Sequence, residues 1–380
     1  MPDDFFDQRR EWSRWKHETL RRYLARFVGI LCSHNRFVYQ IDAFAGAGAY
    51  RAQHIPGSPL LAATIAEWFT AHQKLTCELR CINVEPNHRE FQRLVAETAK
   101  YPSPIVHNRR GEFGDLLGDI LATIRDAPAL FFLDPYGFKG MEWNTVYQVA
   151  DRFHHFPTEL IINFNGDELY QAAGWRDSVD RTKAPAFVQT VTAFFGTDDW
   201  LRVCDSAMTK AQCIEQLADL YMDRLTRIIG GFVARYPVRT RKGQLKYYLL
   251  FATKHARGVR EFSDIIFDVE SQYQVDLLTY RPTAGDLEQH RLHAAAELLP
   301  DQKKADADIV SNLAVAMPEA LAGRSLTFGA VQTEMALHGW FGRARIKHYR
   351  AAVKQLIGNG KISGAKATGV EDKTSLTFAA

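Results

Sequence analysis

Short apolar segments alternate with amphipathic segments along the first half of the chain, and this alternation constrains the fold more than any other feature. Phe37–Phe44, Leu79–Val84 and Ala129–Leu133 are apolar runs of strand length, separated by segments with helical periodicity. Strands that alternate with helices form parallel sheets with right-handed crossovers. The sequence therefore predicts an α/β domain with a parallel sheet.

A later stretch predicts an antiparallel hairpin at the edge of this sheet. Gly231–Arg239 and Leu245–Thr253 are β-rich runs joined by the polar, glycine-bearing segment 240–244. Residues 165–210 show little periodicity, and we expect a helical insertion there. The expected fold class is α/β, a Rossmann-like sheet completed by an antiparallel hairpin.

The composition changes after the polar segment 281–304, which we expect to be a linker. Three helical segments and two short strands are expected beyond it: Ala307–Met317, Phe328–Leu337, Arg343–Ile357, Lys361–Ser363 and Ser375–Phe378. Three helices followed by a small hairpin are typical of a winged helix-turn-helix. The expected domains are thus residues 1–280, which carry the Rossmann-like sheet, and residues 305–380, which form a winged helix.

The composition indicates the cellular environment of the protein but does not identify a partner. The formal net charge is only +3, and the five cysteines form no C-x-x-C pair. An odd number of scattered cysteines argues against a disulfide framework and a zinc cluster, and suits a reducing cytosol. The N-terminus lacks the apolar core of a signal peptide, and no apolar run is long enough to span a membrane. We therefore expect a cytoplasmic protein without a metal site.

The first candidate site segment is Asp42-Ala43-Phe44-Ala45-Gly46-Ala47-Gly48, which directly follows a buried strand. Ligands of open α/β sheets bind at the carboxyl edge, and Gly46 and Gly48 allow the backbone to approach a ligand closely. A dinucleotide site would continue from the glycines directly into a helix, which this segment does not. The pattern therefore favours a ligand whose polar end is an amino acid; the alternative is a tight turn without a ligand.

Two further acidic positions follow the next strands. Glu85, before Pro86, can accept hydrogen bonds from both hydroxyls of a ribose, although a solvated Glu is the alternative. Glu112 can accept a hydrogen bond from an adenine amino group while Phe113 supplies an apolar face. A Glu that favours the dipole at a helix start is an equally good reading of Glu112.

The segment Asp134-Pro135-Tyr136-Gly137-Phe138-Lys139-Gly140 is the most distinctive in the chain, because it ends a central apolar strand with an acidic residue and an aromatic, glycine-rich loop. Asp134 can accept hydrogen bonds from a target nitrogen, and Tyr136 and Phe138 can stack on the ring that carries it, with Lys139 beside them. A strand-end turn fixed by proline and glycine is the alternative.

Basic residues recur in two places. Arg239, Arg241 and Lys242 lie in or beside the turn of the expected hairpin. The third C-terminal helix carries four more at helical spacing: Arg343, Lys347, Arg350 and Lys354. One basic face on such a helix suits contact with nucleic-acid phosphates, although a solvated charged face is common.

Six segments together resemble the three-Cys-motif partner protein family over about residues 10–275. They are K-H-E-T-L-R-R-Y-L (Lys16–Leu24), D-A-F-A-G-A-G (Asp42–Gly48), G-S-P-L (Gly57–Leu60), V-E-P (Val84–Pro86), F-L-D-P-Y-G-F-K-G (Phe132–Gly140) and Y-Y-L-L-F-A-T-K-H-A-R-G (Tyr247–Gly258). The resemblance implies a Rossmann-like S-adenosylmethionine methyltransferase domain that works in bacteria with a radical S-adenosylmethionine protein, whose three cysteines lie in the partner.

A more remote resemblance to nucleic-acid adenine methyltransferases rests on Asp134-Pro135, although Tyr136 stands where their second proline would be. The resemblances together imply a methyltransferase that binds S-adenosylmethionine and acts on nucleic acid. Asp42, Ala43, Phe44, Gly46 and Gly48 would hold the methionine end, Glu85 and Pro86 the ribose, and Glu112 and Phe113 the adenine. A non-catalytic scaffold for the radical enzyme is the main alternative, and a DNA-processing subunit such as a nuclease is a second.

Overall fold

The chain forms two compact units, Met1–Lys254 and His255–Ala380, in a computed structural model. The described residues are 11–50, 55–72, 77–102, 104–138, 140–175, 184–203, 208–240, 243–279, 302–366 and 369–379. The division falls after Lys254, earlier than the expected boundary at residues 281–304, most of which lie outside the described residues. No helix in the described part of the chain combines the length and apolar character needed to cross a membrane.

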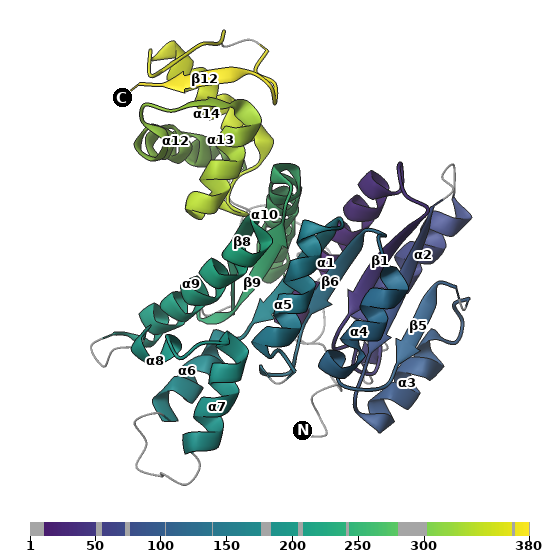
Figure 1. The fold of residues 1–380 in the computed structure, drawn as a ribbon. Coiled ribbons are helices and arrows are strands. Elements are labelled where there is room, and N and C mark those ends of the chain that lie inside the picture. Colours follow the sequence, from purple (N-terminus) through teal and green to yellow (C-terminus); the bar gives the residue numbers. More distant parts are fainter. Residues whose placement is uncertain are drawn as a thin grey trace, which may run out of the picture. The chain divides into compact units, whose positions relative to one another are not determined.

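The first unit is built on a seven-stranded sheet with the order β5-β4-β1-β6-β7-β9-β8 (Figure 1). Its strands are β1 (Phe37–Asp42), β4 (Glu78–Val84), β5 (Val106–Arg109), β6 (Ala129–Leu133), β7 (Thr158–Phe164), β8 (Phe232–Arg239) and β9 (Leu245–Thr253). The first five are parallel, whereas β9 is antiparallel to both β7 and β8. The parallel sheet and its antiparallel hairpin are therefore confirmed. The arrangement is Rossmann-like: from β1 the chain adds β4 and β5 on one side and then β6 and β7 on the other, so the strand order reverses between β1 and β6.

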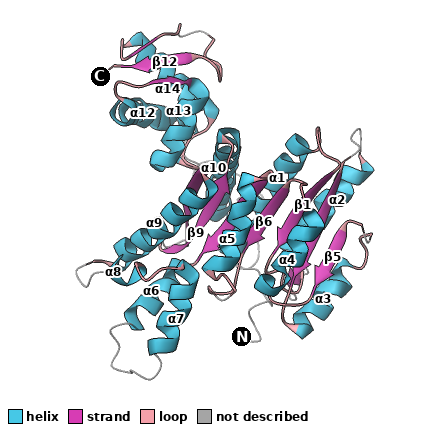
Figure 2. Cartoon of the chain, in the orientation of Figure 1, coloured by secondary structure: helices cyan, strands magenta, loops and turns pink. Residues whose placement is uncertain are grey.

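Helices cover both faces of the sheet, as the cyan helices on either side of the magenta strands show in Figure 2. They are α1 (Glu11–Leu31), α2 (Ser58–Ala71), α3 (His88–Thr98), α4 (Phe113–Ile124), α5 (Trp143–Asp151), the 3₁₀ turn η1 (Arg152–His154) and α9 (Lys210–Ile229). All five residues of β6, Ala-Leu-Phe-Phe-Leu, are buried, because a central parallel strand is covered on both sides. This burial explains the continuous apolar run in the sequence.

The two faces of the sheet differ in character. Alternate residues of β1 and β6, such as Ile41 and Phe131, pack into the main apolar core with α4, α5 and α9. Of the intervening residues of β1, which face the other side, Val38 is apolar, whereas Gln40 and Asp42 are buried polar side chains. The sheet therefore carries polar groups beneath α1 and α2, and these groups lead to the candidate site.

The segment expected to be an insertion contains three short helices within its described residues. They are α6 (Gly166–Trp175), α7 (Ala184–Phe195) and α8 (Trp200–Val203). Phe194 of α7 stacks on Tyr221 of α9 with 5.0 Å between ring centroids, and it also contacts Phe164 at the end of β7. These aromatic contacts attach the segment to the core beside the end of the sheet.

A short antiparallel ribbon, which the sequence did not reveal, separates Gly48 from the next helix. It consists of β2 (Ala49–Tyr50) and β3 (Ile55–Pro56). Gly57 is the N-cap of α2. The reason is local: Ser58 is already helical and Pro59 follows it within the first turn, so the extended residue before the helix is Gly57.

The second unit combines helices with a three-stranded antiparallel sheet of order β10-β12-β11. Its elements are α10 (Ala256–Thr279), α12 (Gln302–Leu321), β10 (Ser325–Thr327), α13 (Phe328–Met335), the π turn η2 (Ala336–Trp340), α14 (Ile346–Gly358), β11 (Ile362–Ser363) and β12 (Ser375–Phe378). Neither α10 nor β10 was expected. Arg343, expected within the third helix, precedes α14, because a turn at 341–343 and extended backbone at Arg345 delay the helix start.

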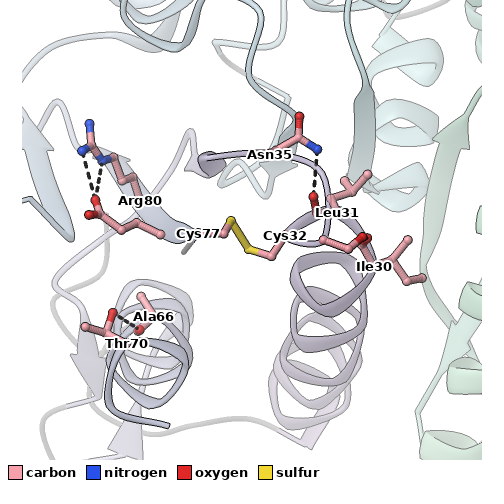
Figure 3. The surroundings of a disulfide bond; sticks show 10 residues. Ile30, Leu31, Cys32, Asn35, Ala66, Thr70, Cys77 and Arg80 are labelled. Carbon is pink, nitrogen blue, oxygen red and sulfur yellow. Dashed lines mark hydrogen bonds and ion pairs between the residues drawn. A yellow bond between two sulfur atoms is a disulfide. The ribbon is translucent and has the colours of Figure 1, made fainter. Parts of the chain in front are cut away.

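Cys32 and Cys77 form a disulfide, which contradicts the expectation that the cysteines are unpaired (Figure 3). The bond joins the end of α1 to the residue before β4, with 5.2 Å between the Cα atoms. Both side chains are buried. Residues 45 positions apart in the chain meet because parallel strands and crossover helices bring them together, and no cysteine spacing in the sequence indicates this.

We expect the Cys32→Ser variant to be less stable than the unmodified chain under oxidising conditions. Opening a loop of 45 residues removes a constraint on the unfolded chain that corresponds to about 4 kcal/mol. Urea unfolding with and without a reducing agent measures the difference. Reduction should lower the midpoint of the unmodified chain toward that of Cys32→Ser; equal midpoints in all four conditions would show that this bond contributes nothing.

Candidate functional site

The carboxyl ends of the five parallel strands meet at one edge of the sheet. Asp42, the last residue of β1, lies between Asn83 of β4 and Phe132 of β6 in the strand register. Val84 pairs with Arg109 in the same way, and Leu133, the last residue of β6, pairs with Ile162, two residues before the end of β7. The segments that follow these strands therefore lie at the edge where the strand order reverses, between β1 and β6. Open α/β sheets bind their ligands at this position.

The glycine-rich turn after β1 adopts a conformation that needs its glycines. Gly46 and Gly48 have φ values of 59° and 82°. A Cβ atom on Gly48 would lie 3.2 Å from Leu94 Cδ1, and the Gly48 carbonyl accepts a hydrogen bond of 2.7 Å from Gly57 N. Ala43, just before the turn, is buried and its N–H donates to the Phe132 carbonyl at 3.1 Å. The turn is thus tied to β6 and to the start of α2.

Two backbone N–H groups from different segments fix the orientation of the Glu85 carboxylate. Its Oε2 accepts a 3.0 Å hydrogen bond from Gly46 N, and its Oε1 accepts one of 2.7 Å from Asn87 N. Burial raises the pKa of this carboxyl, and the two backbone donors oppose that effect. Each carboxylate oxygen has two lone pairs, so Glu85 can still accept from a ligand. Pro86, beside it, is exposed.

Glu112 and Phe113 occupy different environments. Glu112 is exposed at the start of α4 and makes no capping hydrogen bond. Phe113 is 1% exposed and belongs to the main core, so it does not offer a ring face at the surface. The half-buried ring of Phe44 packs 6.3 Å from Phe113, and a Cβ atom on Gly140 would lie 3.1 Å from Phe44 Cε1. Phe44 is therefore the aromatic side chain beside Glu112 and Gly140.

Asp134 is held by two side chains from elements on either side of it. Asn163 of β7 donates from Nδ2 to Asp134 Oδ1 at 2.7 Å. Lys16 of α1 forms an ion pair with Asp134 Oδ2, and the two side chains are only 8% and 17% exposed. The Lys16 ammonium also lies 5.7 Å from the ring centroid of Tyr247 in β9. The carboxylate is thus fixed in orientation by one donor on each oxygen.

The aromatic loop after Asp134 divides into an exposed and an anchored part. Tyr136 is 48% exposed, which leaves its ring able to stack on a ligand. Phe138 instead packs edge-on against Phe194 of α7 at 6.0 Å, so it anchors the loop rather than presenting a second platform. A Cβ atom on Gly137 would lie 2.5 Å from Glu168 Oε2, and Gly137 has a φ of 82°. Lys139 lies outside the described residues.

Asp42 is fully buried at the centre of the edge. Burial raises the pKa of its carboxyl to about 7; a hydrogen bond with Ser58 opposes the shift, and the nearby charge of Asp134 adds to it. The Phe44 N–H also donates to Asp42 Oδ1 at 3.3 Å, and the positive charge of Lys16 opposes the shift as well. Asp42, Asp134 and Lys16 therefore form one electrostatic cluster between the glycine-rich turn and the aromatic loop.

Three residues beside Asp134, or beside the lysine that pairs with it, were missed as site residues: Lys16, Asn163 and Tyr247. Lys16 and Tyr247 stand in motifs that carry the family resemblance, yet nothing in either motif showed that their side chains meet Asp134. No pattern in the sequence marks this part of the helix, where Trp15, Lys16 and His17 follow one another. All three are buried, because Trp15 stacks on Tyr236 at 5.4 Å and His17 approaches Tyr50 at 5.9 Å.

The basic residues predicted to contact nucleic acid lie in both units. Arg239, at the end of β8, is exposed and donates to the Gly243 carbonyl at 3.0 Å, whereas Arg241 and Lys242 lie outside the described residues. The other four basic positions are exposed, three of them on α14 and Arg343 before it: Arg343, Lys347, Arg350 and Lys354. Lys347 forms an ion pair with Asp306 of α12.

The described part of the chain contains no group of three His, Cys, Asp or Glu side chains that could bind a metal ion. The edge offers instead carboxylates, a lysine, amides and exposed tyrosine and backbone groups. Such a set can bind a ligand with hydroxyl and ammonium groups and can hold an acceptor nitrogen next to a carboxylate.

Comparisons with known proteins give only distant structural matches. No family model matches the chain, and no curated protein matches it by sequence. A protein from Legionella pneumophila is 11% identical over 68% of this chain and 92% of its own, with a TM-score of 0.38. PKMT2 from Rickettsia typhi is 7% identical over 64% of this chain and 56% of its own, with a TM-score of 0.31.

A third match is a SAM-dependent methyltransferase from Anabaena variabilis, 8% identical over 64% of this chain and 94% of its own, with a TM-score of 0.29. At TM-scores this low, these similarities say nothing about which residues act or on what.

The buried carboxyl of Asp42 should make stability depend on pH. The pKa of an aspartate in an unfolded chain is about 3.9, whereas the pKa of Asp42 in the folded chain is about 7. A raised folded-state pKa contributes stability that is complete below about pH 4 and is lost as the pH rises through about 7. We expect the unmodified chain to lose up to about 4 kcal/mol relative to Asp42→Asn across this interval.

Urea unfolding of both proteins at several pH values measures this difference. Glu159 is also buried and has a pKa raised to about 7, so only the difference between the two proteins at each pH isolates Asp42. A difference that stays constant from pH 4 to pH 8 would mean that the Asp42 carboxyl ionises in the folded chain as it does in water.

Proposed function

We propose that this chain is an S-adenosylmethionine-dependent methyltransferase that acts on nucleic acid. The observation that carries the proposal is the convergence of four strand-end segments at the switch point of the sheet: the Asp42–Gly48 turn, Glu85, Glu112 and the Asp134–Gly140 loop. They combine a glycine-lined approach with separate carboxylates, as a ligand with an amino-acid end and an adenosyl end requires.

The residues present fit this cofactor. The turn at Gly46 and Gly48 would receive its amino-acid end, and Glu85, already oriented by two backbone donors, would accept from the ribose hydroxyls. Exposed Glu112 would reach the adenine amino group, with Phe44 rather than buried Phe113 beside it. The cofactor supplies a sulfonium methyl group that is intrinsically reactive, so the protein's contribution is proximity and alignment.

Asp134 would act on the methyl acceptor. Its carboxylate is held by Asn163 and Lys16 at the end of β6, and it can hydrogen-bond a target nitrogen and take its proton. The exposed ring of Tyr136 would stack on the base that carries this nitrogen. A base inside a duplex must leave the helix to reach such a site.

The second unit would bring the nucleic acid. We propose that α12, α13 and α14 with the sheet β10-β12-β11 form a winged helix-turn-helix, because α14 directly precedes the β11–β12 hairpin. Its basic residues Lys347, Arg350 and Lys354 would contact phosphates. Arg239 would add a phosphate contact from the first unit.

The family resemblance supports a pairing with a radical S-adenosylmethionine protein, which co-purification of the two proteins would test. A non-catalytic scaffold for that protein is the second candidate. One observation favours it: Asp134 is already bound by Lys16, and Glu85 by two backbone groups. Cofactor binding separates the two candidates.

We expect isothermal titration to detect binding of S-adenosylmethionine to the unmodified chain. Glu85→Gln should weaken this binding by about tenfold or more, because it removes a charged acceptor from the ribose site. Glu78→Gln, at the amino end of the same strand β4, is the matched control and should leave the affinity unchanged.

Transfer of a labelled methyl group to DNA and RNA then tests catalysis. Asp134→Asn should lower the rate by about a hundredfold while leaving cofactor affinity within a few fold. No heat of binding with the unmodified chain would favour the scaffold, and loss of binding in Asp134→Asn would mean that Asp134 belongs to the cofactor site.

We also expect the triple variant Lys347→Ala, Arg350→Ala, Lys354→Ala to bind nucleic acid more weakly. Each lost phosphate contact should reduce the dependence of log K on log salt concentration by about 0.9. Fluorescence anisotropy with a labelled duplex at several salt concentrations measures the slope. Arg257→Ala, an exposed arginine of α10 in the same unit, serves as the control. The idea that α14 contacts phosphates is rejected if triple variant and control give the same slope.

A further inference from the structure

Lys16 lies where an acceptor amine would have to bind. Its ammonium forms an ion pair with Asp134, the carboxylate at the end of β6, and its charge also acts on Asp42, at the start of the glycine-rich turn. The amine of Lys16 therefore sits between the segment proposed to hold the cofactor and the segment proposed to hold the acceptor.

The position of Lys16 is fixed by its neighbours in α1. Trp15 stacks on Tyr236 of β8, and His17 approaches the ring of Tyr50 in the β2–β3 ribbon. These contacts hold the helix across the carboxyl edge from the ribbon to the hairpin. The Lys16 side chain is 8% exposed, so its ion pair with Asp134 is shielded from water.

The groups around the Lys16 ammonium form a recognition set for a primary amine. Asp134 pairs with Lys16 through Oδ2, and Asn163 fixes the orientation of this carboxylate by donating a hydrogen bond to Oδ1. Tyr247 places an aromatic ring within reach of the positive charge, at 5.7 Å from its centroid. Carboxylates and aromatic faces both stabilise ammonium groups, and more strongly when the site is shielded from water.

We propose that the pocket formed by Asp134, Asn163 and Tyr247 binds the primary amine of the methyl acceptor, and that Lys16 occupies it until the acceptor enters. The methyl-transfer part of this inference rests on the proposed function, whereas binding of an amine in the pocket does not. Lys16 must then leave Asp134 before the acceptor nitrogen can take its place, which makes it a positioning residue rather than a catalytic one.

The chemical step balances without any further reactant. The amino group of a base is neutral, so the acceptor binds as an amine that donates an N–H to the Asp134 carboxylate. Its nitrogen lone pair forms the new bond to the methyl carbon as the bond from that carbon to the sulfonium sulfur breaks. The electron pair of the broken bond stays on sulfur, and the nitrogen, now positively charged, gives a proton to the Asp134 carboxylate. S-adenosylhomocysteine and the methylated amine leave as the two products.

Chemical rescue of the full-length Lys16→Ala variant tests amine binding. The substitution removes the atoms beyond Cβ, and n-propylammonium has the same atoms as the deleted part of the side chain. We expect the variant to melt at a lower temperature than the unmodified chain and n-propylammonium to raise its Tm by about 3 °C, saturably. If the variant does not fold alone, the yield of refolding with and without n-propylammonium gives the same readout.

Matched controls separate a specific site from a general effect of the salt. Tetramethylammonium, which has no N–H donor, and sodium chloride at equal concentration should not rescue the variant. Lys347→Ala removes another lysine paired with an aspartate, but an exposed one, and should not respond. The double variant Lys16→Ala, Asp134→Asn should also not respond. Equal effects of n-propylammonium and sodium chloride on Lys16→Ala would overturn the amine pocket.

A second arm tests the acceptor assignment. With S-adenosylmethionine present, Lys16→Ala should convert n-propylamine to N-methylpropylamine, detected by mass spectrometry, and the unmodified chain should not. Rescue by n-propylammonium without methylation, in a protein shown by titration to bind S-adenosylmethionine, would overturn the assignment of this pocket to the acceptor. Absence of cofactor binding in the unmodified chain would instead reject the proposed function. The rescue experiment would then still show whether an amine binds beside Asp134.

Discussion

Three carboxylates gathered at one sheet edge are the constraint on which the local structure depends. A buried carboxylate is costly unless it is protonated, paired or hydrogen-bonded, and each of the three is compensated differently. Asp42 has a pKa raised to about 7 by burial. Glu85 accepts from the Gly46 and Asn87 backbone, and Asp134 is held by a lysine and an asparagine.

This compensation explains several features that are otherwise unrelated. The turn after β1 brings the Gly46 N–H to Glu85, and its φ of 59° suits a glycine. The first turns of α1 cross the edge of the sheet, because Lys16 must reach Asp134. The asparagine on β7 and the tyrosine on β9 face the same cluster.

Much of the fold could be predicted from the sequence because its signals are local. The strands Ala129–Leu133 and Leu245–Thr253 have the bounds that their apolar patterns indicate. The predictions that failed concern contacts between distant residues. The pairing of Cys32 with Cys77 depends on where α1 ends relative to β4. The anchoring of Phe138 depends on α7, whose position no pattern near the loop encodes.

The sequence by itself determined the order of strands and helices and which polar residues end each strand, because hydrophobic periodicity and glycine placement act over a few residues. Only the tertiary structure decided which of those residues meet, and with what. Register and helix packing place Lys16 on Asp134, and they bury Phe113 while leaving Tyr136 at the surface. These outcomes depend on contacts between segments far apart in the chain, which periodicity and motif spacing do not specify.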